Sequence, residues 1–470
     1  MLKKIISIIL ICAMAVTFTA CSGDNTSFVS GNSNTSSDTS KPQNNIAVEN
    51  TPNKVDDTLP QCEPANSCYE GVMKGDSGYY YKDSWWISES ASFRGIVYYD
   101  NATGKSIPLC SKPQCMHDGN AFCASSGFAS EYDVLYNGYI YRLGYYITET
   151  ERIIRLLRSD LLGNELSTVS DVYKSLLSDD DVYPLMDNPV FHYGKMIFSF
   201  EKNSGEQSSR VLFMVDLETG ASKEIYVPEP ENNPTRIFSQ CYRTLVADGD
   251  WLYYTTREVK WDKTGKRDEA HMTYNRTVLY RFNIKTGKTE IISAMPDIYS
   301  SFTVNNGIIY YTVVDRNSNT FSLYAYDTMK KGSATLAQNI QQEFLDGKYV
   351  GDIINVTVLT DRKYLYICTG GVSGSSGLKE DVDDIDFYVY DFEGNQLLHG
   401  LSGMESFLDM EKEWSYSFSA LDGEIYICYQ DHDEWNRELD ENIKSGMYRI
   451  KTADLVNGST DWQKLYTVVK

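Results

Sequence analysis

Basic residues and histidine are scarce in this sequence, and no catalytic motif is present. The 43 Lys and Arg residues stand against 65 Asp and Glu residues, which leaves a formal charge of -22. A protein that binds a nucleic-acid backbone needs a positively charged surface, so the charge argues against DNA or RNA as a partner. The 5 histidines are scattered. No G-x-S-x-G, H-E-x-x-H or glycine-rich phosphate loop occurs, which leaves binding as the default interpretation.

Apolar and aromatic residues are plentiful enough to build a large core. They make up 42% and 13% of the 470 residues, which excludes a wholly disordered protein. Tyrosine is the outlier, with 36 copies against only 12 prolines. Because tyrosine fits the pleated, half-buried surface of a sheet, the composition favours strands. The length is compatible with several domains or with one large all-β domain.

Residues 1–20 have the pattern of an export signal. Lys3 and Lys4 precede an apolar stretch, Ile5 to Val16, that is too short to span a membrane. The following segment, Phe18-Thr19-Ala20-Cys21, resembles the lipobox of bacterial lipoproteins, in which the cysteine is acylated and becomes the new N-terminus. The resemblance implies a palmitate-type lipid on Cys21 and attachment to the extracytoplasmic face of the cell membrane. An ordinary signal peptide is the alternative.

Residues 21–60 are predicted to form a tether. Ser, Thr and Asn occupy 19 of the 39 positions from 22 to 60, and apolar residues do not recur with a period. Such a segment cannot bury enough surface to offset the entropy lost on ordering it. As a flexible coil it has an r.m.s. reach of roughly 35 Å, which would hold a folded body clear of a membrane surface.

From residue 61 onwards, a polar or glycine turn followed by an aromatic-rich strand recurs at a nearly constant interval. Each copy is followed by a short strand that ends in Asp or Asn and then by a turn with glycine. Asp and Asn suit such turns because they bond to the nearby backbone, and glycine accepts a positive φ. The aromatic-rich strands centre on Tyr81, Tyr141, Ile197, Tyr253, Tyr310, Tyr366 and Tyr426, and the turns start at Asp100, Asp160, Asp216, Asn283, Asp327 and Asp391.

The constant interval between these copies predicts the fold. Each copy has room for four strands, and four-stranded units repeated around an axis make a β-propeller. The sequence therefore predicts an all-β protein with a single β-propeller of seven four-stranded blades over residues 61–470. A propeller of six or eight blades, and a β-sandwich or barrel with coincidental spacing, are the alternatives.

The leader and the blade motifs together resemble the β-propeller lipoproteins of Gram-positive anaerobic bacteria, a family of unknown function. A weaker resemblance links the segments WLYYTT and IIYYTV to the Tyr-Trp-Thr-Asp propellers of low-density-lipoprotein receptors. The Trp and the Asp of that motif are absent here. This second resemblance therefore implies the fold but no calcium or ligand site.

Three insertions are predicted between the second and third strands of blades, around residues 256–276, 369–386 and 430–445. In a propeller these loops share a face with the connections between blades, and long insertions gathered on one face of a repeat protein usually mark its binding side. Trp261 and Trp435 lie in the insertions and would offer flat apolar contacts to a sugar or a peptide. The alternative is that the insertions are surface elaborations that the fold tolerates and that do not bind a ligand.

Two of the insertions are rich in carboxylates. The clustered acids are Asp381, Asp383, Asp384 and Asp386 in one insertion and Asp431 and Asp433 in the other. Such a cluster could hold Ca²⁺, which takes six to eight oxygen ligands. Neither stretch matches the D-x-[DN]-x-[DN]-G loop, so a solvated acidic rim is the favoured interpretation.

The connection between blades one and two, residues 110–131, contains a cysteine and histidine cluster. Cys110, Cys115, His117 and Cys123 fall within fourteen residues, with Cys62 and Cys68 upstream. Three thiolates and an imidazole suit a tetrahedral Zn²⁺ site. The competing interpretation is that disulfides cross-link the loop and the N-terminal segment, since disulfides can form in an exported protein. With either a metal ion or disulfides, residues 110–123 are predicted to form a compact cross-linked segment beside the first blade.

These features together predict a lipid-anchored surface protein that binds an extracellular glycan, peptide or protein through its loop-rich face. The alternative is a glycan-active or other hydrolytic propeller enzyme. Propeller glycosidases place carboxylates at the central channel, and the fold decides which of the 65 acidic residues reach it. A structural interaction platform is a third interpretation.

Overall fold

The computed structural model describes residues 72–469 apart from a set of turns and connections. The predicted signal peptide and tether lie outside the described residues, as do Cys21, Cys62 and Cys68. In the part of the chain that is described, no helix is long and apolar enough to cross a membrane. The internal gaps in the description are 89–90, 118–122, 129, 165, 177–188, 205–206, 226–234, 238–244, 262–271, 296–301, 316–317, 319, 342–355, 370–385, 404–413 and 432–443.

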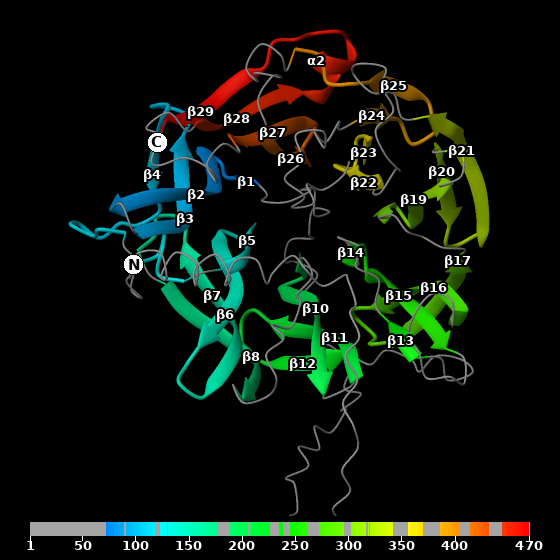
Figure 1. The fold of residues 1–470 in the computed structure, drawn as a ribbon, viewed down its shortest axis with the longest axis horizontal. Helices are drawn as coiled ribbons and strands as arrows, with labels where there is room; N and C mark the ends of the chain where they lie inside the picture. Colours follow the sequence, from blue (N-terminus) through cyan, green and yellow to red (C-terminus); the bar gives the residue numbers. More distant parts are fainter. Residues whose placement is uncertain are drawn as a thin grey trace, which may run out of the picture. The chain divides into compact units, whose positions relative to one another are not determined.

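Seven antiparallel sheets follow one another in chain order around the molecule and form a β-propeller (Figure 1). Blade one contains β1 (Met73–Lys74), β2 (Gly78–Ser88), β3 (Ala91–Asp100) and β4 (Lys105–Pro108). Blade two contains β5 (Ser130–Tyr136), β6 (Tyr139–Ile147), β7 (Glu151–Asp160) and β8 (Leu166–Leu176). Blade three contains β9 (Val190–His192), β10 (Lys195–Ser204), β11 (Gln207–Asp216) and β12 (Ser222–Ile225).

The fourth blade has a divided first strand. β13 (Thr235–Ile237) and β14 (Leu245–Asp248) both pair with β15 (Trp251–Trp261), which is followed by β16 (Met272–Asn283) and β17 (Thr289–Met295). Blade five contains β18 (Phe302–Asn305), β19 (Ile308–Asp315), β20 (Thr320–Asp327) and β21 (Gly332–Gln341). Blade six contains β22 (Val356–Thr360), β23 (Leu365–Thr369), β24 (Asp386–Tyr390) and β25 (Gln396–His399). Blade seven contains β26 (Trp414–Leu421), β27 (Glu424–Asp431), β28 (Lys444–Lys451) and β29 (Gln463–Val469), with the short helix α2 (Thr452–Val456) between its last two strands.

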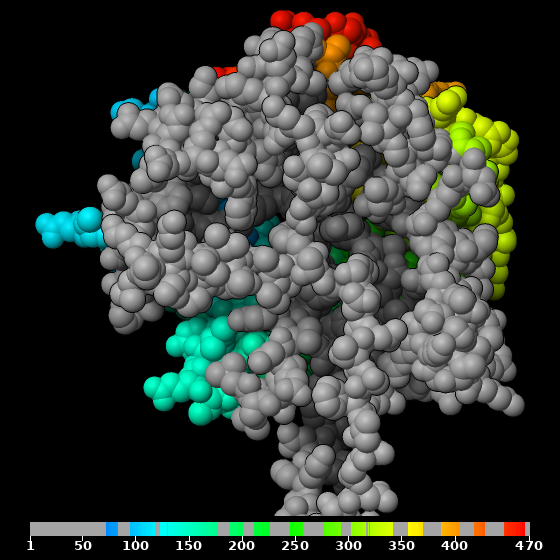
Figure 2. Space-filling model, in the orientation of Figure 1, coloured from blue at the N-terminus to red at the C-terminus, as the bar shows by residue number. Residues whose placement is uncertain are grey.

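The repeated motifs of the sequence fall where a propeller requires them, and the prediction of seven blades is confirmed. Every central residue of the aromatic-rich motif lies in the second strand of its blade, from Tyr81 in β2 to Tyr426 in β27. The fourth strands lie at the perimeter. β21, for example, is largely exposed and is visible at the edge of the space-filling view in yellow-green (Figure 2).

The turns between third and fourth strands use the predicted Asp chemistry. Asp216 ends β11, and its Oδ1 accepts hydrogen bonds from the backbone N–H groups of Glu218 (3.1 Å) and Thr219 (2.8 Å). Gly220 then closes the turn with a φ of +71°, a conformation that glycine adopts without a steric cost. In blade five Lys331 takes this place with a φ of +54°. In blade seven α2 replaces the turn.

The core is divided among the seven boundaries between neighbouring blades. Each boundary has its own cluster of buried apolar side chains in the described part of the chain. In β10 the consecutive residues Met196, Ile197 and Phe198 are all fully buried. Met196 and Phe198 pack towards blade two, whereas Ile197 packs towards blade four. Both faces of a blade are therefore buried, which explains the nearly continuous apolar runs.

Side-chain contacts close the ring between blades seven and one. Among the described residues, neither blade borrows a strand from the other end of the chain. All four strands of each of these blades come from one end of the described chain. Tyr79 and Tyr81 of blade one pack with Tyr426 of blade seven. Lys74 Nζ lies 3.2 Å from Glu424 Oε2, and the Tyr426 hydroxyl donates to the same carboxylate at 2.5 Å. Burial raises the pKa of Glu424, but Tyr426, Lys74 and the positive charge of Arg449 outweigh it and lower the pKa overall.

Candidate functional site

The two ends of the blades carry connections of different length. At one end, here called the short-turn face, the links between first and second strands and between third and fourth strands are tight turns of two to five residues, except for the link that contains α2. At the other end, the loop face, second and third strands are linked, and so are consecutive blades. The longest link within a blade joins Thr369 to Asp386, and the longest link between blades joins Pro108 to Ser130.

The three predicted insertions each link a second strand to a third strand, and the strand ends that they join lie on the loop face. The first is partly a longer hairpin, because β15 and β16 stay paired as far as Trp261 and Met272. Asp386 begins β24 and pairs with Thr369, and Asp431 ends β27. The backbone thus places these residues at the loop-face ends of their strands. Trp435, Asp381, Asp383, Asp384 and Asp433 lie outside the described residues, and a Ca²⁺ site among the acids stays a prediction.

Tyr146 and Ile147 form an exposed apolar tip that the sequence reasoning missed. They end β6 on the loop face, and their side chains are 43% and 49% exposed. The guanidinium of Arg155 lies over the Tyr146 ring at 4.1 Å from its centroid. The sequence did contain a sign of this tip, the apolar run Tyr145, Tyr146 and Ile147. Such runs were expected to belong to the core, because strands of a propeller are usually buried on both faces.

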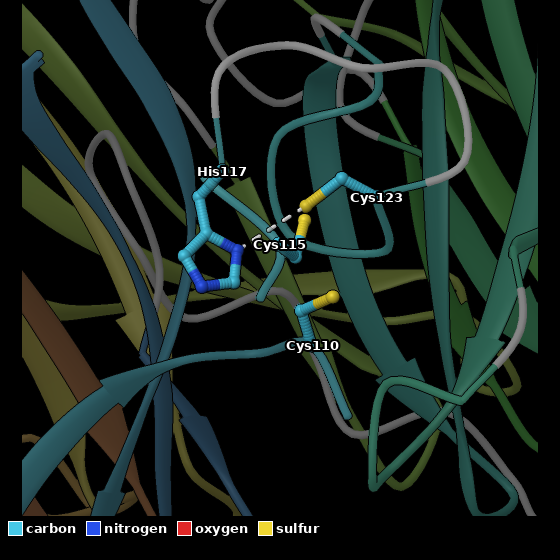
Figure 3. Close-up of side chains that lie close together, drawn as sticks. All are labelled: Cys110, Cys115, His117 and Cys123. Atoms are coloured by element: carbon cyan, nitrogen blue, oxygen red, sulfur yellow. Dashed lines mark hydrogen bonds between the residues drawn. The ribbon is translucent and has the colours of Figure 1, made fainter. Parts of the chain in front are cut away.

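The cysteine and histidine cluster comes together in space (Figure 3). The three Sγ atoms of Cys110, Cys115 and Cys123 and a ring nitrogen of His117 all lie within 4.8 Å of one another. His117 Nδ1 is 3.5 Å from Cys123 Sγ. Cys123 is buried, and the other three residues are partly exposed. Cys110, Cys115 and Cys123 are free thiols in the structure, so no disulfide joins any two of them.

The first end of the cluster is fixed against blade two. Cys110 follows the end of β4 by two residues. The next residue, Ser111, donates its backbone N–H to Gly163 O at 3.1 Å. Gly163 lies in the turn between β7 and β8 with a φ of +69°, and a methyl group there would meet the backbone of Leu109 at 2.7 Å. This close approach requires glycine.

The second end of the cluster is built into the boundary between blades one and two. Ser125 accepts a backbone hydrogen bond from Ile96 of β3 and also donates its hydroxyl to Ile96 O at 2.7 Å. Arg142 of β6 donates to Ala124 O at 2.9 Å and to Phe128 O at 2.7 Å. Its Nε also donates to Asp133 Oδ1 at 3.2 Å. The chain that follows Cys123 is thus held by both blades.

The surroundings of Cys123 favour its thiolate form. Burial raises its pKa, but hydrogen bonds from the Ser126 side chain, the His117 ring, the Ser126 backbone N–H (3.4 Å from the sulfur) and Cys115 outweigh this effect and lower the pKa of Cys123 to about 6. For Cys115, a hydrogen bond from the backbone of His117 lowers the pKa, but burial and the neighbouring thiols outweigh it and raise the pKa. The thiolate is the form of cysteine that binds metal ions.

No protein-family model matches the sequence, and no curated protein is similar enough in sequence to be matched. Dipeptidyl peptidase 4 of Porphyromonas gingivalis is 12% identical with a TM-score of 0.42, over 87% of this chain and 54% of that one. The puromycin-hydrolyzing peptidase of Mycobacterium tuberculosis is 10% identical with a TM-score of 0.42, over 88% of this chain and 56% of that one.

A third solved structure, the β-propeller domain of the Trilobed protease from Pyrococcus furiosus, is 13% identical with a TM-score of 0.35. The match covers 71% of this chain and 96% of that one. This chain spans about half the length of the two peptidases. All three matches are low in both sequence identity and TM-score.

Proposed function

We propose that this protein is a lipid-anchored binding protein on the extracytoplasmic face of the cell membrane, and that its loop face holds an extracellular glycan, peptide or protein. The observation that supports this proposal is that the long links between second and third strands leave and re-enter the blades at the loop face, whereas most links at the other end are tight turns. A rigid scaffold that collects long loops on one face commonly uses that face for recognition.

The exposed ring of Tyr146, at the loop-face end of β6, offers an aromatic contact to such a ligand. The strand register puts the backbone of Trp261 at the same end of blade four. Large aromatic side chains supply much apolar contact area and a polar group with little loss of side-chain entropy, and they are enriched where binding energy is concentrated.

The lipid anchor is tested at Cys21. We expect Cys21→Ser to abolish incorporation of labelled palmitate and to move the protein from the membrane fraction to the soluble fraction. Cys12→Ser, in the apolar part of the leader, is the control and should leave both unchanged. Mass spectrometry of the mature N-terminus gives an independent readout, and an unmodified residue there would contradict the anchor.

Ligand binding is tested with glycan and peptide arrays probed with the purified mature chain. Tyr146 and Tyr139 form a matched pair, because they lie at opposite ends of β6 with 43% and 40% exposure and each has an arginine stacked on its ring. We expect Tyr146→Ala to weaken binding by about tenfold or more and Tyr139→Ala, on the short-turn face, to have no effect. Equal effects of the two substitutions would contradict a ligand on the loop face.

The same preparation distinguishes binding from catalysis. Every glycan or peptide that binds is incubated with the protein, and the products are followed by chromatography. Recovery of the intact ligand is expected for a binding protein. Turnover of a bound ligand would favour the hydrolytic alternative. If neither the glycan array nor the peptide array shows binding, a glycan or peptide ligand is contradicted.

A further inference from the structure

We propose that Cys110, Cys115, His117 and Cys123 bind one Zn²⁺ ion in a closed, structural site that fastens the connection between blades one and two. This inference is independent of the proposed ligand on the loop face. It rests on the convergence of four ligand atoms, on the type of those atoms and on the way in which both ends of the connection are held.

The spacing of the four side chains is close to that of a metal site. A tetrahedral Zn²⁺ ion with Zn–S bonds near 2.3 Å and Zn–N bonds near 2.0–2.1 Å keeps its ligand atoms roughly 3.5–3.8 Å apart. His117 Nδ1 and Cys123 Sγ are already 3.5 Å apart, and no pair in the set exceeds 4.8 Å. A disulfide would require two of these sulfurs at about 2.04 Å, whereas all three are free thiols.

The type of ligand selects the metal. Three thiolates with one imidazole favour zinc over the hard cations Mg²⁺ and Ca²⁺, which prefer oxygen. Four protein ligands also fill a tetrahedral shell, so no position is left for water or a substrate. The site therefore has a structural role. Zinc displaces a proton from each bound thiol that is not yet ionised, and the zinc–sulfur bonds form without oxidation or reduction.

Strain in the backbone shows how tightly the cluster is defined. Gln114 and His117 both have left-handed backbone conformations, with φ values of +62° and +53°. Such conformations are strained in a residue other than glycine and persist where the surrounding structure holds them in place. The anchors at Ser111 and at Ser125 supply part of that constraint, and the metal would supply the remainder.

The direct test is the metal content of the full chain. Protein purified without chelators is analysed by inductively coupled plasma mass spectrometry, and we expect one zinc per chain. Replacement of zinc by Co²⁺ should produce thiolate-to-cobalt charge-transfer absorption and the d–d bands of a tetrahedral site. Iron or copper in place of zinc, or a cobalt spectrum without thiolate bands, would overturn the assignment.

Variants locate the site. We expect Cys115→Ser and His117→Ala each to lower zinc affinity by more than roughly 100-fold, since even changes outside the ligand shell cost about 10- to 100-fold. Cys368→Ser is the matched control, because Cys368 is a buried cysteine in β23 of blade six. It should keep a full equivalent of zinc. Equal zinc loss in Cys368→Ser and Cys115→Ser would overturn the proposal.

Thiol alkylation of the wild-type chain gives a second readout that does not depend on any variant folding. With zinc bound, Cys110, Cys115 and Cys123 should resist iodoacetamide, and all three should react after chelation. Chelation should also lower the melting temperature, and added zinc should restore it. A disulfide at any of the three in protein isolated with thiols trapped, including a bridge to Cys62 or Cys68, would overturn the proposal.

Discussion

Replacing Arg142 by methionine tests the buried ionic network at the boundary of blades one and two. The Arg142 side chain is 1% exposed and donates to Asp133 and to two backbone carbonyl oxygens, at 2.7–3.2 Å. Asp133 would keep Lys82, at 3.2 Å, as its cationic partner. Removing one member of a buried ion pair costs about 3–5 kcal/mol, and each carbonyl left without a donor adds to that cost. We therefore expect Arg142→Met to lower the free energy of unfolding by at least about 3 kcal/mol.

The matched control is Arg155→Met in the same blade. Arg155 pairs with Asp171 at 2.6 Å, but the two side chains are 20% and 25% exposed, so the loss should be about 0–1 kcal/mol. Unfolding in urea, followed by tryptophan fluorescence, measures both variants. The reasoning is refuted if Arg142→Met costs no more than Arg155→Met.

Three further predictions concern backbone conformation and pH. Lys331→Gly should stabilise the fold by about 0.5–1 kcal/mol, because glycine adopts the φ of +54° without strain; a lower urea midpoint would contradict this. Gly163→Ala should cost more than Gly138→Ala, since both have positive φ but a methyl group meets backbone at 2.7 Å only at Gly163; equal midpoints would show that the clash is relieved. The lowered pKa of Glu424 stabilises the fold above its unfolded value of about 4.3, and this contribution is lost as pH falls through the folded value. Glu424→Gln should therefore have a lower free energy of unfolding than the wild type at pH 7 and the same free energy of unfolding in acid. A difference that persists in acid would contradict the lowered pKa of Glu424.

The repeat of the sequence determined the blades because each blade is a local structure. Its strands pair with their neighbours along the chain, so the hydrogen-bonding partners of a strand lie within a single copy of the repeat. The turns are local as well. Asp216 and Gly220 specify their turn through contacts between near neighbours in the chain, and such short-range preferences can be read from the sequence alone. The loop-face insertions followed from the same periodicity.

Long-range packing determined the features of the structure that the sequence did not predict. Arg142, in the strand NGYIYR, has the sequence signature of an ordinary charged strand residue, and it is buried only because residues 124–128 fold across it. The closure of the ring by Lys74, Glu424 and Tyr426 joins the two ends of the described chain and has no local signature. The cysteine spacing allowed both zinc and disulfides. Only the folded chain showed that three sulfurs and one imidazole nitrogen lie close together, because two different blades fix the two ends of their connection.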